Sequence, residues 1–347
     1  MARVYLDHNA TTPLRPEARA AMLAAMEVAG NPSSVHAEGR AAKGVIERAR
    51  AQVAAALGAE GADIVFTSGA TEAAATALAG RGLVCGAVEH EAVLAWAAAD
   101  VPVHPTGAVM VSEPARTAMQ LANSETGIVQ ALPDGLAVSD LTQGFGKLAF
   151  AFNWLHTDIG FGSAHKIGGP KGVGVLVLRR GIDLAALIRG GGQELGRRAG
   201  TENLIGIAGF GAAAAAAARD LADGVWDGVA EHRNSLETAL ETAAPGTIFV
   251  GKGRPRLPNT SCLLTPGWKG ETQVMLMDLA GFAVSAGSAC SSGKVRTSRV
   301  LRAMGFDEVA AGSAIRVSLG RETTRDDVLR FADAWLGQQR KFRARAA

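Results

Sequence analysis

Between Asp63 and Leu178 the chain alternates short apolar runs with turn signals and helical patterns. This alternation is typical of a mainly parallel β-sheet covered by helices, because each buried strand must be followed by a crossover connection. The strands that we expect here are Ile64–Thr67, Leu83–Val88, Ala118–Ala122, Leu136–Ser139, Thr157–Gly160 and Val173–Leu178. We therefore predict an α/β fold for this part of the chain.

The C-terminal part shows a different pattern, helical from Ala208 towards Pro245 and then broken into short apolar runs. There we expect strands at Ser261–Leu264, Ala283–Ser285 and Ala314–Leu319, and a helix near Ser298–Met304. A length of 347 residues suits two domains. We predict a large domain over 14–245 and a smaller α+β domain over 1–13 and 246–347.

Charge and cysteine content exclude several classes of protein. The 35 basic and 33 acidic residues are scattered and nearly balance, so no strong field points to nucleic acid or a membrane surface. The alanine-rich run Gly211–Ala218 is short and closed by Arg219, which favours a packed helix over a membrane span. The 3 cysteines are too few for a disulfide framework or a zinc site. With no signal-peptide pattern, these features predict a cytoplasmic protein without a metal centre.

Residues that suit chemistry follow several of the expected strands. Gly69–Thr71 and His90 come after the first two strands, and Asp140 and Lys166 follow later ones. Ligands of open parallel sheets bind beyond the carboxyl ends of the strands. We therefore expect these residues to share one pocket.

Lys166 lies in a glycine-rich turn, Ser163–Gly172, between two apolar runs. A lysine in a partly buried turn beside another cation loses its proton more easily, as covalent linkage to an aldehyde cofactor requires. Lys166 is therefore our candidate anchor for pyridoxal 5'-phosphate. Taken alone, the pattern also fits an ordinary solvated loop.

The run Phe66–Glu72 passes from a strand through a small-residue turn into an alanine-rich helix. Backbone amides at such a helix start, with the Thr71 hydroxyl, can hold a phosphate group. The alternative is a simple helix cap formed by Ser68 or Thr71.

Three further residues could act on the cofactor ring. Asp140 would keep the pyridine nitrogen protonated, which makes the ring a better electron sink, and Gln143 could reach the phenolic oxygen. His90 could stack on the ring and move protons near neutral pH. The alternatives are an exposed turn aspartate and a partly buried histidine with satisfied hydrogen bonds.

Two residues of the C-terminal part could act on a substrate. Cys290 lies in a small, polar, glycine-flanked run that suits a nucleophilic thiol, whereas Cys85 and Cys262 lie in apolar strand patterns and are expected to be inert. Arg316 is a lone cation inside a strand pattern. Its guanidinium suits bidentate capture of a carboxylate, and a solvated arginine on an edge strand is the alternative.

Together these motifs resemble those of the cysteine desulfurases, which are class V aminotransferase-like, fold-type I pyridoxal phosphate enzymes. The resemblance rests on motifs spread over nearly the whole chain: Tyr5–Pro13, Asn31–His36, Thr67–Glu72, Glu89–His90, Asp140–Gln143, Ser163–Gly172, Gly190–Glu194, Arg198–Thr201, Gly287–Cys290 and Arg316–Gly320. It implies a large domain with a mainly parallel seven-stranded sheet flanked by helices, and a smaller α+β C-terminal domain.

The resemblance implies that Lys166 carries the cofactor, that Asp140 and Gln143 contact its ring, and that His90 stacks on it. The phosphate group would be held by Ala70, Thr71, Ser163 and His165, and by Thr201 from the other subunit. A residue supplied by a second subunit implies a homodimer.

For the substrate, the resemblance implies that Arg316 binds the carboxylate of L-cysteine, with Asn123 beside it. The lysine amine of Lys166 would remove the α-proton, and Cys290 would take the sulfur as a persulfide, leaving L-alanine. Family members pass this sulfur to acceptors such as iron–sulfur scaffold proteins and thiolation relay proteins.

The chain departs from the family pattern in three places. Relatives usually carry Asn-Asn-Glu where this chain has Asn123-Ser124-Glu125, so Ser124 would face the cofactor. Ala73–Ala75 replace polar residues near the pocket entrance or the dimer interface. The stretch His104–Met119 is shorter than in relatives, which affects the acceptor surface.

Three other interpretations remain open at this point. One is a selenocysteine lyase-like pyridoxal phosphate enzyme, for which Cys290 is dispensable. Another is a catalytically weak paralogue that serves as a partner in a sulfur-transfer complex, as the Ser124 and Ala73–Ala75 departures suggest. A nicotinamide-dependent enzyme ranks last, because no convincing G-x-G-x-x-G follows the first strand.

Overall fold

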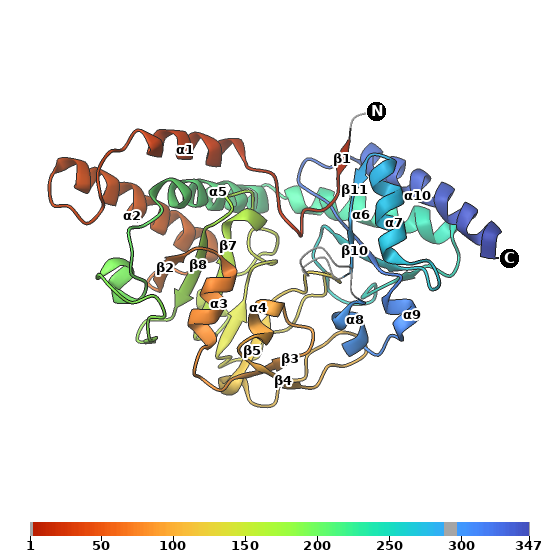
Figure 1. The fold of residues 1–347 in the computed structure, drawn as a ribbon, viewed down its shortest axis with the longest axis horizontal. Coiled ribbons are helices and arrows are strands. Elements are labelled where there is room, and N and C mark those ends of the chain that lie inside the picture. Colours follow the sequence, from red (N-terminus) through yellow and green to blue (C-terminus); the bar gives the residue numbers. More distant parts are fainter. Residues whose placement is uncertain (1–2, 288–296, 347) are drawn as a thin grey trace.

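A computed structural model describes residues 3–287 and 297–346 of the chain. Figure 1 shows two regions side by side, one built on a large sheet and the other on the C-terminal helices. The N-terminal strand lies with the second region, although the helices that follow it in the chain belong to the first.

The large region is organised by a seven-stranded sheet with the order β2-β8-β7-β6-β5-β3-β4. The sheet is parallel except for β8, which runs antiparallel to both β2 and β7, and this confirms the predicted α/β sheet. The strands are β2 (Asp63–Thr67), β3 (Val84–Gly86), β4 (Ala98–Val101), β5 (Thr117–Gln120), β6 (Val138–Asp140), β7 (Ile159–Ser163) and β8 (Gly174–Leu178).

Six of these strands lie where the apolar runs predict them, with ends shifted by a few residues. Strand β4 was not predicted, because three of its four residues are exposed and it carries no apolar pattern. It forms the edge of the sheet beside β3, where such a short, exposed strand is expected.

Helices cover both faces of this sheet (Figure 1). One core cluster joins α1 (Pro16–Met26), α2 (Ala37–Leu57) and α5 (Leu204–Ala222) to one face, and another joins α3 (Ala70–Leu78) and α4 (Glu91–Leu94) to the other. Helix α5 is the one described helix long and apolar enough to cross a membrane, but 56% of its most apolar stretch is buried inside the protein. Its packing against α1 and α2 makes it a core helix, as its alanine-rich run predicts.

The second region contains two small sheets. Strand β1 (Val4–Tyr5) pairs in parallel with β11 (Phe282–Ala283), and the other sheet has the order β12-β13-β10-β9. Its strands are β9 (Ile248–Phe249), β10 (Thr260–Leu264), β12 (Ser285–Ala286) and β13 (Ile315–Ser318). The predicted run Ala283–Ser285 is thus divided between β11 and β12 at Val284, which lies in neither strand.

The helices of the second region are α6 (Val225–Ala243), α7 (Gly270–Leu279), α8 (Arg299–Ala303), α9 (Glu308–Ala311) and α10 (Arg325–Ala346). Short 3-10 turns complete the described fold, η1 (Pro114–Arg116), η2 (Phe152–Trp154), η3 (Ala164–Lys166) and η4 (Gln193–Gly196). Side chains of α6 such as Leu236 pack in the same core cluster as Leu6 and Trp335. The predicted division at residue 245, which assigns α6 to the large domain, stays a prediction.

Candidate active site

A cavity of about 530 Å³ opens where the carboxyl ends of the large sheet meet the second region. It is lined by residues from the N-terminal segment, from the start of α3, from the turns after β3, β5, β6 and β7, and from β13. The predicted site residues among them are Ala70, Thr71, His90, Ser124, Asp140, Gln143, Ser163, His165, Lys166 and Arg316. One cavity therefore gathers predicted side chains as far apart in the chain as Ala70 and Arg316.

Lys166 ends the η3 turn that follows β7. Its Nζ donates to the carbonyl oxygens of Asn9 at 2.6 Å and Ala10 at 2.8 Å. Gly168, which follows in the chain, has a φ of 82°, and a Cβ there would lie 2.5 Å from the Arg15 side chain. The turn is therefore fixed against the N-terminal segment, and the solvated-loop alternative does not describe it.

Asp140 ends β6 with its carboxyl group inside the cavity lining. Its Oδ1 accepts a hydrogen bond of 2.8 Å from the Thr142 backbone amide. Burial raises the pKa of Asp140, although this hydrogen bond and the positive charges of His90 and Lys166 oppose the rise. A cation placed beside Asp140 would favour its ionised form, and the exposed-turn alternative is excluded by its burial.

His90 lines the same cavity and begins α4, where its Nδ1 accepts from the Ala92 amide at 3.1 Å. This contact makes His90 the N-cap of a helix, so its ring orientation is fixed on one side while the ring faces the cavity. Both proposed uses of this histidine, structural and catalytic, therefore fit the same side chain.

The start of α3 supplies a site for an anion. The N-cap is Gly69, and no side chain caps the helix, so neither Ser68 nor Thr71 plays the capping role that was the alternative. The first amides of a helix have no acceptor within it and carry partial positive charge. A Cβ on Gly174 of β8 would lie 2.5 Å from the Gly69 carbonyl carbon, so glycine there lets the sheet approach the helix start.

Two side chains of the β7–η3 segment, Ser163 and His165, line the same cavity as this helix start. Ser163 is buried, with its Oγ 3.4 Å from the Val173 carbonyl oxygen. His165 contacts Thr11 Oγ1 through Nδ1 at 3.1 Å. Burial, reinforced by the charges of Lys166 and Lys171, lowers the pKa of His165 to about 4, so its ring is neutral near pH 7.

The turn after β5 places Ser124 and Asn123 differently. Ser124 lines the cavity, whereas Asn123 is buried beneath it and is absent from the lining. The Asn123 Oδ1 accepts from the amides of Glu125 and Thr126 at 2.9 and 2.8 Å, and its Nδ2 donates to Val88. The structure therefore assigns Asn123 to shaping the turn and does not bring it to the substrate side.

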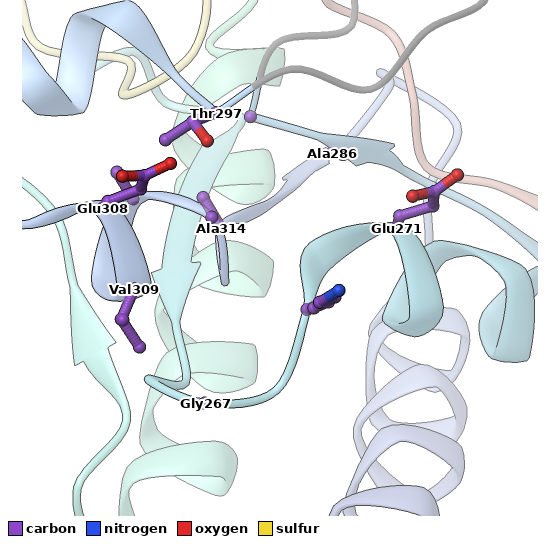
Figure 2. Close-up of a pocket in the computed structure, with 11 residues that line it drawn as sticks. Gly267, Glu271, Ala286, Thr297, Glu308, Val309 and Ala314 are labelled. Atoms are coloured by element: carbon purple, nitrogen blue, oxygen red, sulfur yellow. The ribbon is translucent and has the colours of Figure 1, made fainter.

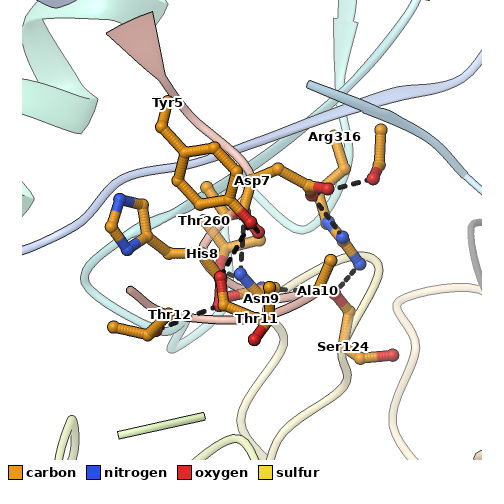
Figure 3. Close-up of polar contacts among 12 residues, drawn as sticks. Tyr5, Asp7, His8, Asn9, Ala10, Thr11, Thr12, Ser124, Thr260 and Arg316 are labelled. Atoms are coloured by element: carbon orange, nitrogen blue, oxygen red, sulfur yellow. Dashed lines mark hydrogen bonds and ion pairs between the residues drawn. The ribbon is translucent and has the colours of Figure 1, made fainter. Parts of the chain in front are cut away.

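Arg316 lies on β13, between β12 and β10, and is 2% exposed. Its Nη2 pairs with Asp7 Oδ1 at 2.7 Å and its Nη1 donates to the Ser124 carbonyl at 3.0 Å, as Figure 3 shows. Its Nε is buried without a hydrogen-bond partner in the structure described here. The edge-strand alternative is thus excluded, and the guanidinium retains a donor for a further anionic group.

Thr201, like Asn123, does not line this cavity. Thr201 is exposed and lines a neighbouring cavity of about 250 Å³, which shares Ser68 and Gly172 with the main one. Cys290 lies outside the described residues. The other cysteines, Cys85 and Cys262, are fully buried, and burial raises the pKa of each thiol to about 12, as expected of inert thiols.

The Ala73–Ala75 departure has a structural explanation. Ala73 and Ala74 are fully buried in the core between α3 and the sheet. Only Ala75 is partly exposed. Ala73 and Ala74 therefore lie in the core and form part of neither a pocket entrance nor the surface.

Sequence reasoning gave no role to Asn9, which lines the cavity, or to Lys147, which hydrogen-bonds to the lining residues Asn9 and Gln143. Asn9 was part of the quoted N-terminal motif, and Lys147 follows Gln143 by one helical turn's spacing. Both are buried, at 1% and 3% exposure. A lysine among apolar residues so close to a candidate cofactor contact is the signal that could have identified Lys147.

A second cavity, of about 430 Å³, lies within the second region (Figure 2). Its lining is mostly small residues, with Lys269, Glu271 and Glu308 as the charged side chains. It lies beside Gly287 and Thr297, the described residues that flank the segment with Cys290. The residues described around it include no nucleophilic thiol, histidine or buried lysine.

The main cavity fits pyridoxal 5'-phosphate by its donors and acceptors. An uncapped helix start suits the phosphate group, a buried carboxylate suits the ring nitrogen, and the Lys166 amine suits the aldehyde. In the parts of the chain that the structure covers, no group of three or more histidine, cysteine or acidic side chains could hold a metal ion.

Known proteins are similar to this chain in sequence and in fold. The profile of the family described as Aminotransferase class-V matches residues 4–331. A cysteine desulfurase of Cereibacter sphaeroides is 40% identical over 372 residues, covering 96% of this chain and 95% of that protein. One from Frankia sp. is 40% identical over 380 residues, covering 95% and 90%. The structure of a NifS-like protein from Rickettsia africae has a TM-score of 0.87 at 31% identity, covering 96% and 98%.

Proposed function

Because the chain belongs to the aminotransferase class-V family, we propose that it is a pyridoxal 5'-phosphate-dependent cysteine desulfurase that converts L-cysteine to L-alanine. The family and the fold type predicted from the motifs are confirmed by the matching profile and by the solved relative. The observation that carries the activity is the meeting of Lys166, Asp140, His90 and Arg316 on one cavity.

The residues that would hold the cofactor come from three strand ends. The helix start at Ala70 and Thr71, with Ser163 and His165, would bind the phosphate group. Asp140 would pair with the ring nitrogen, and Lys166 would bond to the aldehyde carbon. When bound, the cofactor supplies an electron sink that stabilises negative charge at the substrate α-carbon.

Lys166 is the base of this scheme. In the described structure its amine is held by two backbone carbonyls of the N-terminal segment, so it lies at a fixed point over the cavity. The neutral amine would remove the α-proton of the substrate and return a proton to the product. The neutral ring of His165 adds no competing positive charge to this neighbourhood.

Arg316 would orient the substrate by its carboxylate. The guanidinium is already fixed by Asp7 and by the Ser124 carbonyl, and its free Nε is available to an anion. A buried arginine held in this way loses little side-chain freedom on binding, which favours affinity.

Cys290 would accept the sulfur of L-cysteine. Its thiolate attacks the substrate sulfur, so that the carbon–sulfur bond breaks as a sulfur–sulfur bond forms. The carbon keeps the electron pair and takes up a proton, which gives L-alanine and a persulfide on Cys290. The deeply buried Cys85 and Cys262, whose thiols are held protonated, are unsuitable for this role.

The wider context is also part of the proposal. The persulfide sulfur would pass to an acceptor protein such as an iron–sulfur scaffold. Thr201, exposed beside the phosphate end of the cavity, would reach the site of a second subunit in a homodimer. The near balance of 35 basic and 33 acidic residues supports a cytoplasmic protein that binds neither nucleic acid nor a membrane.

The activity is tested by incubating the cofactor-loaded protein with L-cysteine and a reductant and measuring L-alanine. We expect catalytic alanine from the wild type and none above background from Cys290→Ser. Alanine from both proteins would favour the selenocysteine lyase-like alternative, which a comparison of cysteine with selenocysteine would then test. Alanine from neither, with cofactor bound, would favour the weak paralogue that acts as a partner protein.

A further inference from the structure

Glu125 lies in the turn after β5, and its side chain contacts the second region. Its Oε2 accepts a hydrogen bond of 2.5 Å from Oγ of Ser298, a residue that is 1% exposed. The same Oγ accepts from the Leu301 amide at 3.1 Å, which makes Ser298 the N-cap of α8. Glu125 therefore fixes the start of the helix that follows residues 288–296 in the chain.

Gly287, on the other side of residues 288–296, lies at the same place. A Cβ on Gly287 would lie 3.2 Å from Ser298 Cβ and 3.5 Å from Glu125 Oε2. Its amide donates to the Ala314 carbonyl at 3.2 Å, which holds it on the second region. The described residues on both sides of 288–296 therefore meet beside the Glu125 carboxyl group.

The turn that carries Glu125 is fixed by hydrogen bonds of its own. Asn123 Oδ1 accepts from the Glu125 amide at 2.9 Å, and from the amide and Oγ1 of Thr126 at 2.8 and 3.1 Å. Gly127, with a φ of 75°, closes the turn by donating to the Asn123 carbonyl at 3.0 Å. Because these bonds leave the backbone little freedom, the Glu125 side chain starts from a fixed point.

The same turn holds the arginine that we propose for the substrate carboxylate. The Ser124 carbonyl, one residue before Glu125, accepts from Arg316 Nη1 at 3.0 Å (Figure 3) and from Asn9 Nδ2 at 3.2 Å. Consecutive residues of one turn thus contact Arg316 and both sides of the segment that contains Cys290. The turn gives the substrate and this segment a common reference point.

The proposed sulfur transfer depends on such a reference point. Cys290 follows Gly287 by three residues in the sequence, and three residues of chain span at most about 11 Å. Reacting atoms must approach to about 3–3.5 Å, and a misplacement of about 1 Å can cost roughly 10²-fold in rate. The position of Gly287 therefore bears directly on the step that Cys290 would carry out.

We propose that Glu125 is a positioning residue for sulfur transfer: it holds Gly287 and Ser298 together, and so aligns the segment that contains Cys290 with a substrate bound at Arg316. The inference rests on the proposed function, because it concerns the use of Cys290 as the sulfur acceptor. It assigns no contact with the substrate or the cofactor to Glu125 itself.

The loss of the Glu125 carboxyl group leaves α8 with a further anchor on the large region. Arg299 donates to the carbonyl oxygens of Ala87 and Glu89 at 3.3 and 3.0 Å and pairs with Glu91 at 3.1 Å. Glu125→Ala should therefore fold, which thermal unfolding checks, and lose only the contact at the two ends of 288–296.

The first test compares two reactions of the cofactor-loaded full chain. Exchange of the α-hydrogen of L-alanine in deuterated water uses Lys166 and Arg316 but no thiol, whereas alanine formation from L-cysteine also uses Cys290. In Glu125→Ala we expect alanine formation to fall about 10- to 100-fold, with α-hydrogen exchange within about twofold of the wild type. Equal losses in both reactions, or full alanine formation, would overturn the proposal.

Further variants test the contact itself. Glu125→Gln keeps an acceptor for Ser298 and should restore alanine formation to within about threefold of the wild type. Ser298→Ala removes the partner, so the double variant with Glu125→Ala should be no more than about twofold slower than the slower single variant. Fully additive losses, or a glutamine variant as slow as the alanine variant, would contradict the proposed contact.

Two controls match the chemistry of these substitutions. Glu113→Ala removes an exposed carboxylate. Asp307→Ala removes the N-cap of the neighbouring helix α9, as Ser298→Ala does for α8. Both should keep the wild-type ratio of the two reactions. A changed ratio in either control would show that the ratio does not report on the Glu125 contact, and the proposal would fail.

A second test needs neither cofactor nor activity. Amide hydrogen exchange of Gly287 and Leu301, measured by mass spectrometry, should be about tenfold faster in Glu125→Ala than in the wild type and unchanged in Glu113→Ala. If exchange responds in this way but the wild type forms no alanine, the proposed function fails while the anchoring by Glu125 stands. If the wild type forms alanine and Glu125→Ala matches it in every measurement, the function stands and the positioning role fails.

Discussion

The main cavity and the cavity of the second region differ in chemistry far more than in size. The main cavity measures about 530 Å³ and the one in the second region about 430 Å³. The first receives side chains from the ends of four strands of one sheet and from β13, with buried lysine, aspartate and arginine among or directly behind them. The second is built mainly from small residues and from charged side chains at its rim, such as Glu271 and Glu308 (Figure 2).

The difference shows what identifies a site here. Volume alone would not separate the two cavities. In the main cavity Asp140 and His165 have pKa values moved from their ordinary ranges, chiefly by burial, and so has Lys147, which hydrogen-bonds to the lining residue Gln143. The shifted pKa values, and the meeting of segments that are distant in the chain, identify the main cavity as the functional site.

The largest expected effect concerns Lys166. Lys166→Ala should lower the rate of alanine formation by about 10³-fold or more, because both the base and the covalent anchor are lost. The rate is measured with L-cysteine and a reductant, with Lys43→Ala as a control on the exposed face of α2. A variant that keeps a tenth of the wild-type rate would show that Lys166 is not essential. The claim that the main cavity, and not the second one, carries the reaction would then lose its main support.

The next effect concerns Arg316. Arg316→Lys keeps the charge but loses the planar fork, so the KM for L-cysteine should rise by roughly 10- to 100-fold, the equivalent of one charge-assisted hydrogen bond. Steady-state kinetics over a wide range of cysteine concentration would measure it. Arg302→Lys, an exposed substitution on α8, is the control. An unchanged KM would mean that the substrate carboxylate binds elsewhere.

A smaller effect is expected at Glu125, whose Oε2 accepts a hydrogen bond of 2.5 Å from Ser298 Oγ. Burial raises the pKa of Glu125 to about 7. The folded protein therefore binds an extra proton between about pH 4.5 and 7, so the free energy of unfolding falls as pH rises through this window, by up to about 3 kcal/mol.

Glu125→Gln should remove this component of the pH dependence. Urea unfolding at pH 5 and pH 8 gives the difference for each protein, and Glu113→Gln, an exposed carboxylate, is the control. If wild type and Glu125→Gln lose the same stability between the two pH values, the carboxyl group of Glu125 is not protonated in the fold as described.

The smallest effect is expected in the second cavity. Val309 lines it and is 62% exposed. Val309→Ala should change the free energy of unfolding by no more than about 0.5 kcal/mol, with the alanine rate and cofactor affinity unaltered. A marked loss of activity in this variant would show that the second cavity takes part in the reaction. The contrast between a functional main cavity and an inactive second cavity would then be wrong.

Much of the fold follows from local patterns in the sequence. The buried strands β2, β5 and β8 are predicted because continuous apolar runs between turn signals are typical of a covered sheet. The exposed edge strand β4 is missed because its residues, Ala98–Val101, carry no such pattern. The break at Val284 is missed for a different reason, since pairing of β11 with β1 and of β12 with β13 divides a single apolar run.

The site is predictable where chemistry follows a strand end, as at Asp140 and Lys166. It is not predictable where long-range contacts decide the role. Asn9 bonds to Ser318, 309 positions away, and only the fold shows that it also joins Lys147 to Lys166. Asn123 was expected beside the substrate, but local turn hydrogen bonds use its side chain.

The most direct test of the account is to identify the lysine that carries the cofactor. The loaded protein is reduced with borohydride, digested, and the peptide with the pyridoxyl group is sequenced by mass spectrometry. The account predicts that the group is on Lys166, in the peptide that includes the η3 turn. Label on Lys147 or another lysine, or no label on a protein that has bound the cofactor, would contradict it.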